Sequence, residues 1–330
     1  IHARRGVVLA AGGYPADPAR RRTSFPHAPT GHEHWTAAPP ENTGDGLALG
    51  ESVGGRIDAA LLHPASWAPV SLVPCRNRPP GHFPHLIERA KPGIIAVTAD
   101  GRRFANEADG YHQFIGRLLQ VTPQGQRPVC WLIADHRFVR RYGLGHAKPA
   151  PVPLWPSIRS GYLKRGRTLR DLATACGIVP VGPDRDFDDP VGLEATIAAY
   201  NEHAQHGRDP AFGRGETPYN RAGGDAGHGP NPCVAPIGDG PFYAVEVVPG
   251  SLGTFAGLAV DARARVLDGA EAPIAGLYAV GTDAASVMGG TYPAGGINLG
   301  PGMSFGFLAG RDLAGLPALT GKHAEQEMTA

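Results

Sequence analysis

The stretch from Gly276 to Arg311 constrains the fold most, because a short apolar run, a glycine-rich crossing and an amphipathic run follow one another there. Leu277 to Val280 is predicted to be a strand. Gly281 directly after it removes the side chain at the point where a ligand would pass. Pro301 suits the first position of a helix, because its missing N–H would have no partner there. The sequence thus predicts a strand and a helix on either side of a glycine-lined space.

The run after Pro301 has the spacing of a helix, and we expect its apolar stripe of Met303, Phe307 and Leu308 to pack inward. Free N–H groups at the start of such a helix and the positive end of its dipole stabilise a nearby anion. The residues alone leave two interpretations open. One is a site for a flat, anionic ligand, and the other is a turn that only packs a helix on a sheet.

Four further segments join this one in a resemblance that spans nearly the whole chain: residues 5–14, 42–50, 100–107 and 248–254. In this order they resemble the FAD proteins of the fumarate reductase and 3-ketosteroid dehydrogenase superfamily. The resemblance implies an α/β chain, with a Rossmann-like FAD-binding domain and an inserted α+β cap that forms the catalytic domain. It also implies FAD as the cofactor.

The residues that this resemblance places at the cofactor come from three of the segments. They are Ala11, Gly12, Gly13, Thr43, Gly44, Asp45, Gly46, Gly281, Thr282, Ser286, Asn298 and Leu299. No Gly-x-Gly-x-x-Gly turn, which would hold the pyrophosphate, opens the sequence. We therefore expect an N-terminally incomplete FAD-binding domain, the C-terminal part of a longer flavoprotein; the alternative is a separate N-terminal subunit.

Composition excludes several classes of partner. With 330 residues, of which 42% are apolar, the chain can fill two cores, and a net charge of +1 gives no reason to expect nucleic acid. No apolar run approaches the roughly 20 residues that span a bilayer or resembles a signal peptide, so we expect a cytoplasmic protein. The four cysteines lie far apart, and no ligand cluster accompanies His32 and His34. We therefore expect no metal site and no disulfide framework.

The predicted elements divide the chain into an FAD-binding part at residues 1–70 and 241–330 and a cap at 71–240. In the first part we expect strands at 5–10, 57–63 and 258–261, a loop at 17–40 and a turn into a helix at 43–53 with Leu47 and Val53 facing inward. We expect a strand at 131–134 in the cap and another at 243–248, just after the cap ends. Its two clear helices are 169–176, between Thr168 and Gly177, and 193–206.

Two segments near the expected flavin indicate which branch of the superfamily the chain resembles. A fumarate reductase must bind two carboxylates and therefore needs arginines and histidines at the flavin. At the two matching positions this chain has residues 249–254 and 290–296, in which tyrosine and glycine stand instead. Such a lining suits a neutral ketone. The second segment resembles the Thr-Tyr-Pro-Gly-x-Gly of 3-ketosteroid Δ1-dehydrogenases, which implies a ketosteroid or a similar cyclic ketone as substrate.

The same resemblance implies the catalytic roles. The hydroxyl of Tyr292 and the N–H of Gly296 would hold the substrate's C3 carbonyl oxygen, as an oxyanion hole does. Tyr111 would take the C2 proton, while the C1 hydride passes to flavin N5. Since a free tyrosine has a pKa of about 10, nearby positive charge must favour its anion, and Arg117 and His112 are the nearest such residues in sequence.

Other residues near these segments have structural or uncertain roles. We expect Arg103, Asn106 and Glu107 to lock the cap to the FAD-binding domain through an ion pair and hydrogen bonds. Departures from the steroid pattern are Ser251 in place of aspartate, the pair at 255–256 and Thr282 in place of asparagine or glutamate. These departures leave the substrate open.

Two alternatives remain open. The chain could belong to an enoate or fumarate-reductase-type enzyme with another small substrate, in which case Arg102, Arg117 or Arg137 should face the flavin. It could also be a subunit or remnant that binds partners but no flavin. The electron acceptor is unknown from the sequence.

Overall fold

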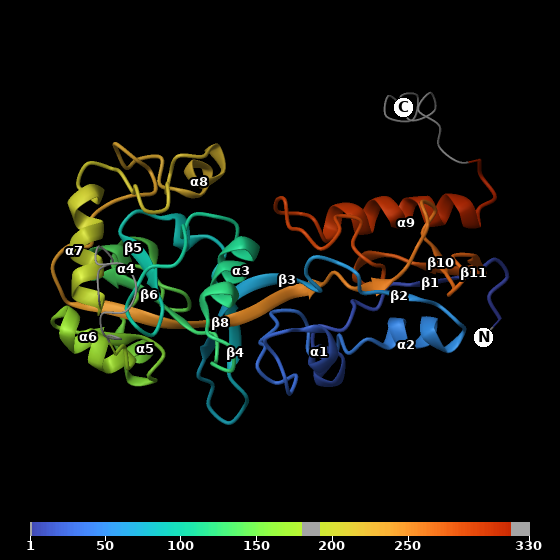
Figure 1. Ribbon diagram of the computed structural model, residues 1–330, viewed down its shortest axis with the longest axis horizontal. Helices are drawn as coiled ribbons and strands as arrows, with labels where there is room; N and C mark the ends of the chain where they lie inside the picture. Colours follow the sequence, from blue (N-terminus) through green and yellow to red (C-terminus); the bar gives the residue numbers. More distant parts are fainter. Residues whose placement is uncertain (1, 180–191, 318–330) are drawn as a thin grey trace. The chain divides into compact units, whose positions relative to one another are not determined.

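The computed structural model describes residues 2–179 and 192–317, which form a mixed α/β fold (Figure 1). The chain divides into two compact units. Unit 1 comprises residues 1–32, 38–66 and 252–330, and unit 2 comprises residues 33–37 and 67–251. The mixed fold agrees with the predicted class, while the domain boundaries at residues 70 and 240 stay a prediction.

Unit 1 is built on a small sheet in the order β1-β11-β10. Strand β1 (Val7–Leu9) lies parallel to β11 (Pro273–Ala279), and β10 (Arg265–Leu267) lies antiparallel on the other edge of β11. A second pairing joins β2 (Ile57–Asp58) to β9 (Gly257–Leu258), so the strands predicted at 57–63 and 258–261 are shorter than expected.

Helix α9 (Leu299–Leu313) packs on this sheet through a face that the sequence did not indicate. Phe305, Ala309 and Leu313, spaced four apart, contact the core around Tyr278. The expected stripe is wrong, because Met303 is 75% and Phe307 54% exposed. Glycines at every few positions of α9 leave apolar residues on more than one face, and only the packing selects between them.

Two short helices complete unit 1. Helix α1 (Pro18–Ser24) lies within the predicted loop 17–40, and its start is capped by Asp17, whose carboxylate accepts a hydrogen bond from the Ala19 N–H. Helix α2 (Asp45–Ser52) follows the predicted turn at Gly44, where φ is +90°. Leu47 is buried as expected, but Val53 is 59% exposed, because the helix ends at Ser52 and Val53 turns outward as its C-cap.

Unit 2 contains a larger antiparallel sheet in the order β4-β3-β8-β6-β5. Its strands are β3 (Ala65–Val73), β4 (Gly81–Pro84), β5 (Ile94–Val97), β6 (Cys130–Asp135) and β8 (Phe242–Thr254), and β7 (Lys164–Gly166) pairs with the first residues of β8. The predicted strands 131–134 and 243–248 are confirmed as parts of β6 and β8.

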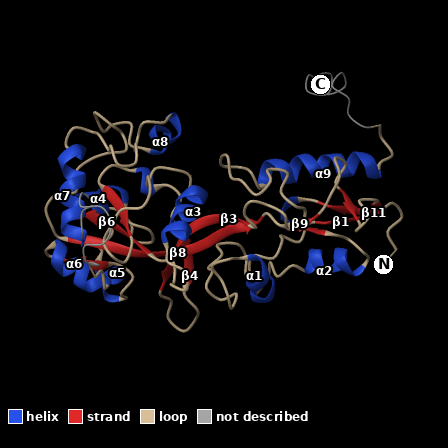
Figure 2. Cartoon of the chain, viewed as in Figure 1, coloured by secondary structure: helices blue, strands red, loops and turns tan. Residues whose placement is uncertain are grey.

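Helices surround the sheet of unit 2 (Figure 2). They are the 3₁₀ helix η1 (Glu88–Ala90) and helices α3 (Tyr111–Val121), α4 (His136–Tyr142), α5 (Trp155–Arg159), α6 (Leu169–Cys176), α7 (Gly192–Ala204) and α8 (Pro218–Gly223). Helix α6 has the predicted bounds, with a capping box between Thr168 and Asp171 and Gly177 at φ +67°. Helix α7 confirms the second prediction within two residues at its end.

The core of unit 2 lies between the sheet and helices α6 and α7. Ile95 and Ile133 of the sheet belong to the same buried cluster as Leu172 of α6 and Ile197 of α7. Helix α3 was missed by the sequence analysis. Another buried set holds it, in which Phe114 and Leu118 lie about one turn apart on α3.

Candidate functional site

Three of the segments predicted to bind the cofactor meet at one buried carboxylate in unit 1. Asp283 accepts hydrogen bonds from the Ala11 N–H at 2.6 Å and from the Gly13 N–H at 2.7 Å. A side chain on Gly46 would collide with the same carboxylate. Asp283 is fully buried in the turn η2 (Gly281–Asp283), directly after β11. It therefore ties residues 11–13 and the start of α2 to the loop that leads into α9.

Asp283 was not among the residues predicted at the site, although the sequence holds a signal for it. An aspartate four residues after the end of an apolar strand has to find donors if it is buried, and the glycine-rich segments supply main-chain N–H groups. In the structure the N–H groups of Ala11 and Gly13 are thus bonded to protein.

Several of the predicted glycines are required by neighbouring protein atoms. A Cβ on Gly12 would lie 2.6 Å from the side chain of Asn42, one on Gly13 would collide with Thr254, and one on Gly44 would lie 2.9 Å from Arg20. Gly12, Gly13 and Gly44 also have positive φ. Their lack of a side chain therefore serves the packing of unit 1 and is explained without a ligand.

Thr43 and Asp45 occupy the exposed start of α2. The Thr43 hydroxyl donates to the Asp45 carboxylate at 3.1 Å and to the Glu41 carbonyl at 3.3 Å. An acidic residue in the first turn stabilises a helix through the dipole. These two residues therefore have a structural explanation at the N-terminus of α2, and their predicted role at a cofactor stays a prediction.

A second group of predicted residues surrounds a pocket in front of α9. The pocket is lined by Thr254, Phe255, Val260, Gly281, Thr282, Ala284, Ala285, Ser286, Val287, Ile297, Asn298, Pro301 and Phe305. Four of the predicted cofactor residues thus come together here. A Cβ on Gly281 would meet no atom within 4 Å, so open space lies in front of this strand end. Bare backbone beside open space is suited to a flat ring system.

The start of α9 differs in detail from the prediction. Leu299 is the first residue of the helix and Pro301 is the third. The Gly300 N–H donates to the Gly296 carbonyl at 2.7 Å, and proline has no N–H to offer. Pro301 is still compatible with the first turn, but fewer main-chain donors remain here for an anion than the sequence suggested.

Tyr292 is fixed beside this pocket. Its side chain is 7% exposed and packs on Phe255, with 6.2 Å between the ring centroids. The Phe255 carbonyl in turn accepts the Ser286 N–H at 2.8 Å. Behind Tyr292, Gly290 has φ +82°, and a Cβ there would lie 2.7 Å from the main chain of His63. A rigid frame therefore holds the tyrosine next to residues that line the pocket.

Gly296 lies four residues after Tyr292 in the same loop. It is exposed, its φ is +91°, and a Cβ built there would meet nothing within 4 Å. The positive φ strongly favours glycine at this position. Whether the Gly296 N–H and the Tyr292 hydroxyl hold one substrate oxygen stays a prediction.

Tyr111 belongs to unit 2 and is the first residue of α3, not part of a loop. Of the two expected sources of positive charge, His112 does not take that role, while that of Arg117 stays a prediction. His112 accepts a hydrogen bond from the Trp67 N–H on Nδ1 at 3.1 Å, so this nitrogen carries no proton and the ring is neutral. Arg117 donates to Gln120 at 3.0 Å and lies six residues along the helix, about 9 Å from Tyr111 along its axis.

Arg103 and Glu107 form a buried ion-pair network in unit 2. Arg103 lies 2.7 Å from Glu107 and 2.8 Å from Asp209, and Arg214 lies 3.1 Å from Glu107. Burial by itself raises the pKa of Glu107, but the charges of Arg103 and Arg214 outweigh it and lower this pKa. Asn106 donates to Asn220 at 2.9 Å. The expected ion pair and hydrogen bonds exist, but these partners all lie within unit 2, so the expected lock to the other domain is corrected.

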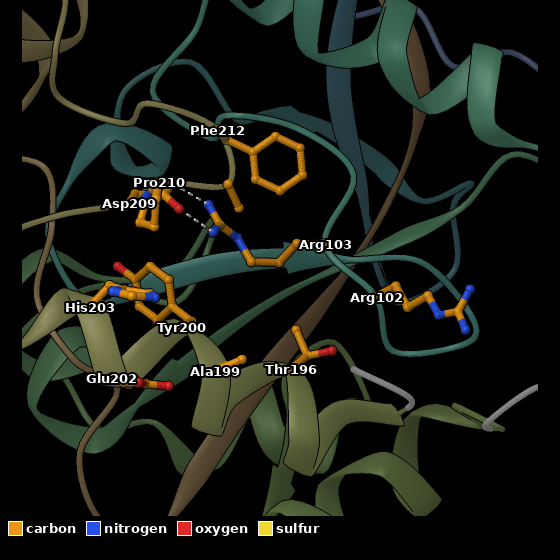
Figure 3. A pocket seen from close by; sticks show the side chains of 11 residues that line it. Arg102, Arg103, Thr196, Ala199, Tyr200, Glu202, His203, Asp209, Pro210 and Phe212 are labelled. Carbon is orange, nitrogen blue, oxygen red and sulfur yellow. Dashed lines mark hydrogen bonds and ion pairs between the residues drawn. The ribbon is translucent and has the colours of Figure 1, made fainter. Parts of the chain in front are cut away.

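A cavity of about 450 Å³ opens beside this network (Figure 3). Figure 3 shows the guanidinium of Arg103 directed at Asp209, and the rings of Tyr200 and Phe212 lie 4.9 and 4.8 Å from it. The arginine is thus occupied by ion pairs and ring faces, and we assign no ligand to this cavity.

The other residues singled out from the sequence have local partners. Ser251 forms a hydrogen bond of 2.8 Å with His34. Arg102 lies 3.9 Å from Asp100, and Arg137 donates to the Pro236 carbonyl at 2.9 Å. Within residues 2–179 and 192–317, no group of three histidine, cysteine, aspartate or glutamate side chains is placed to hold a metal ion.

Comparison with known proteins identifies the class of this protein. A family model described as an FAD binding domain matches residues 1–299, and the chain belongs to this family. The pocket before α9 offers open space at Gly281 and the polar groups of Thr282, Ser286 and Asn298, but its cavity of about 30 Å³ is too small to enclose a flavin ring by itself. FAD is therefore the cofactor of the family to which the chain belongs.

Two relatives match nearly the whole chain. The chain is 43% identical to a 4-oxocyclohex-2-ene-1-carboxylate 5-dehydrogenase of Sinomonas cyclohexanicum over 96% of its length and 52% of that protein. It is 36% identical to a 3-oxosteroid 1-dehydrogenase of Mycolicibacterium smegmatis over 98% of its length and 54% of that protein.

A solved structure matches as well. It is the 3-ketosteroid Δ1-dehydrogenase of Sterolibacterium denitrificans in complex with 1,4-androstadiene-3,17-dione, with a TM-score of 0.84 and 37% identity over 96% of this chain and 54% of that one. The chain thus spans about half the length of the relatives that it matches. In the part that the structure describes, none of the helices has the length and apolar character to cross a membrane.

Proposed function

We propose that this chain is part of an FAD-dependent dehydrogenase that removes two hydrogens from adjacent carbons beside a ring ketone. The observation that carries the proposal is the placement of Tyr292, which is buried against Phe255 at the edge of the pocket lined by Gly281, Thr282 and Ser286. A phenol fixed there can donate a hydrogen bond to the carbonyl oxygen of a ring ketone bound beside the pocket.

Bound FAD would supply the acceptor for a hydride, which is the chemistry that no side chain of this protein can provide. The Tyr292 hydroxyl and the Gly296 N–H would hold the carbonyl oxygen of the substrate and stabilise its developing negative charge. Tyr111 would accept the proton from the carbon next to the carbonyl. The next carbon along the ring would lose its hydrogen as hydride to the cofactor, a C=C bond would form between the two carbons, and an external acceptor would take up the electrons.

Tyr111 as base requires that its anion be favoured, since the pKa of a free tyrosine is about 10. Its position as the first residue of α3 offers one source, because the positive end of the helix dipole lies there. This effect adds to the charge expected of Arg117 and takes the place of that expected of His112, whose ring is neutral.

A cyclic ketone is supported as the substrate class. The two most informative relatives are named for ring ketones, one a single ring with a carboxylate and the other a steroid. Residues 249–254 and 290–296 lack the arginines and histidines that a dicarboxylate would need. We therefore favour this reaction over that of a fumarate reductase.

The proposal includes a further portion of FAD-binding protein, on the same chain or on a separate one, to hold the pyrophosphate. Its support is that the relatives are about twice as long and that apolar side chains of α9 and β1 are exposed, among them Met303, Phe307 and Val7. We also propose a cytoplasmic location, which cell fractionation tests.

The test uses the product of the complete gene, purified and scanned for flavin absorbance. It is then mixed anaerobically with 4-androstene-3,17-dione or with 4-oxocyclohexanecarboxylate while the flavin band is followed. Bleaching by either ketone that slows at least 100-fold in Tyr292→Phe supports the proposal, since one oxyanion-hole donor is worth about 10²- to 10³-fold. A bound flavin that neither ketone reduces would refute the substrate class, and a protein without flavin would refute the enzyme.

A further inference from the structure

The loop that leads into α3 is held by a buried arginine from a distant part of unit 2. Arg89 lies in η1 and is 2% exposed. Its Nη1 donates to the Glu107 carbonyl at 2.7 Å, and both terminal nitrogens donate to the Asp109 carbonyl at 3.3 and 3.2 Å. Its Nε donates to the His85 carbonyl at 2.8 Å. The fork of one guanidinium thus fixes two carbonyls within the four residues before Tyr111.

Arg89 also contacts the helix itself. Its guanidinium carbon lies 4.7 Å from the centre of the Phe114 ring, which is fully buried one turn into α3. The side chain therefore contacts the helix on its buried face and the loop before it at the same time. A planar, pre-organised donor fork is suited to this task, because lysine offers a single nitrogen.

The cost of burying this charge argues for a specific role. Burial lowers the pKa of Arg89, and the negative charge of Glu88 raises it in part, which leaves a pKa of about 10. The side chain therefore stays protonated at neutral pH. Its donors go to main-chain carbonyls, whereas Arg103 and Arg214 nearby are paired with carboxylates. A buried cation satisfied by carbonyls is costly, and an apolar residue would serve packing alone.

We propose that Arg89 is the positioning residue of the candidate base Tyr111, and that it acts by fixing the main chain of residues 107–110 from which α3 starts. This inference rests on the proposed function for the role of Tyr111. Other bonds hold the side chains of the same loop, such as the one from Asn220 to the Asp109 carboxylate at 2.9 Å. Asn106 also binds this main chain, since its Oδ1 accepts from the Ala108 N–H at 2.9 Å. Arg89 differs because it comes from another element, η1, and holds two carbonyls of the segment from which the Tyr111 side chain is positioned.

The test compares Arg89→Met, Arg89→Lys and the control Phe138→Leu in the flavin-loaded, full-length protein. Phe138 is buried in the same unit on α4 and contacts neither the loop nor α3 in the interactions described. In Arg89→Met we expect faster hydrogen exchange at residues 107–114 and a kcat about 10- to 100-fold lower with a KM within twofold, since misplaced catalytic groups cost rate more than binding. Arg89→Lys keeps the charge and should recover only part of the rate.

A second readout separates positioning from general destabilisation. With substrate deuterated at the carbon that loses its proton, the isotope effect on flavin reduction should rise in Arg89→Met and stay at the wild-type value in Phe138→Leu. Unchanged exchange at 107–114, or an equal loss of kcat in Phe138→Leu, would overturn the inference. If the wild-type protein reduces its flavin with neither ketone, the proposed function fails, and the exchange data alone decide whether Arg89 holds this loop.

Discussion

Replacing Glu107 by glutamine tests the buried ion-pair network of unit 2 most directly. The carboxylate accepts hydrogen bonds from Arg103 at 2.9 and 2.7 Å, from Arg214 at 3.1 Å and from the Ala96 N–H at 2.9 Å. Removing one partner of a buried pair costs about 3–5 kcal/mol. Because Arg103 keeps Asp209 and Arg214 keeps its carbonyl partners, we expect the lower end of this range, about 3 kcal/mol.

The assay is thermal unfolding at neutral pH followed by near-UV circular dichroism. For a unit of this size about 3 kcal/mol corresponds to a fall in Tm of roughly 6–12 °C. The matched control is Glu246→Gln, which removes an exposed carboxylate 2.9 Å from Arg127 and should cost at most about 1 kcal/mol. The reasoning is refuted if the two variants unfold at the same temperature.

The same network predicts a dependence on pH. The pKa of Glu107 is lower in the folded protein than its usual value of 4.5, so the unfolded state binds this proton more readily. The stabilisation is therefore complete above that usual value and is lost as the pH falls through the folded pKa. The stability gap between the wild-type protein and Glu107→Gln should accordingly shrink in acid, and a gap that widens there would contradict the assigned charge.

Two predictions concern unit 1. Asp283→Asn keeps the shape of the side chain but turns an NH₂ group toward a main-chain donor. We therefore expect a loss of about 2 kcal/mol in unfolding free energy and roughly tenfold weaker FAD retention, measured by flavin fluorescence on dilution. Unchanged retention would show that this carboxylate does not order the cofactor loops. Phe305→Ala should cost about 3 kcal/mol, whereas Met303→Ala on the exposed face of α9 should cost less than about 0.5 kcal/mol in the same denaturant titration. A larger effect of Met303→Ala would mean that the buried face of α9 has been assigned wrongly.

Local sequence signals predicted the helices whose ends are marked by capping residues and the strands that are continuous apolar runs. Helix α6 has the predicted bounds, because Thr168 caps its start and Gly177 supplies the positive φ at its end. Strands β6 and β8 were found from continuous apolar runs. Helix α3 was missed, because Gly110 offers no side-chain cap at its start, and its stability comes from burying Phe114.

The candidate site was predicted in part. The resemblance brought forward Tyr292, Gly296 and the residues of the pocket before α9, and the structure places Tyr292 beside that pocket. It could not show that Asp283 binds the N–H groups of Ala11 and Gly13, because those residues are about 270 positions apart in the chain.

The sequence by itself determined the family, the cofactor and the kinds of residue available for catalysis, since these depend on short motifs whose chemistry is local. The tertiary structure alone decided which face of α9 is buried, which glycines serve packing and that Arg89 holds the loop before Tyr111. The physical reason is that burial and hydrogen bonding between distant segments depend on which groups meet in space, and periodicity in one segment carries no information about its partner.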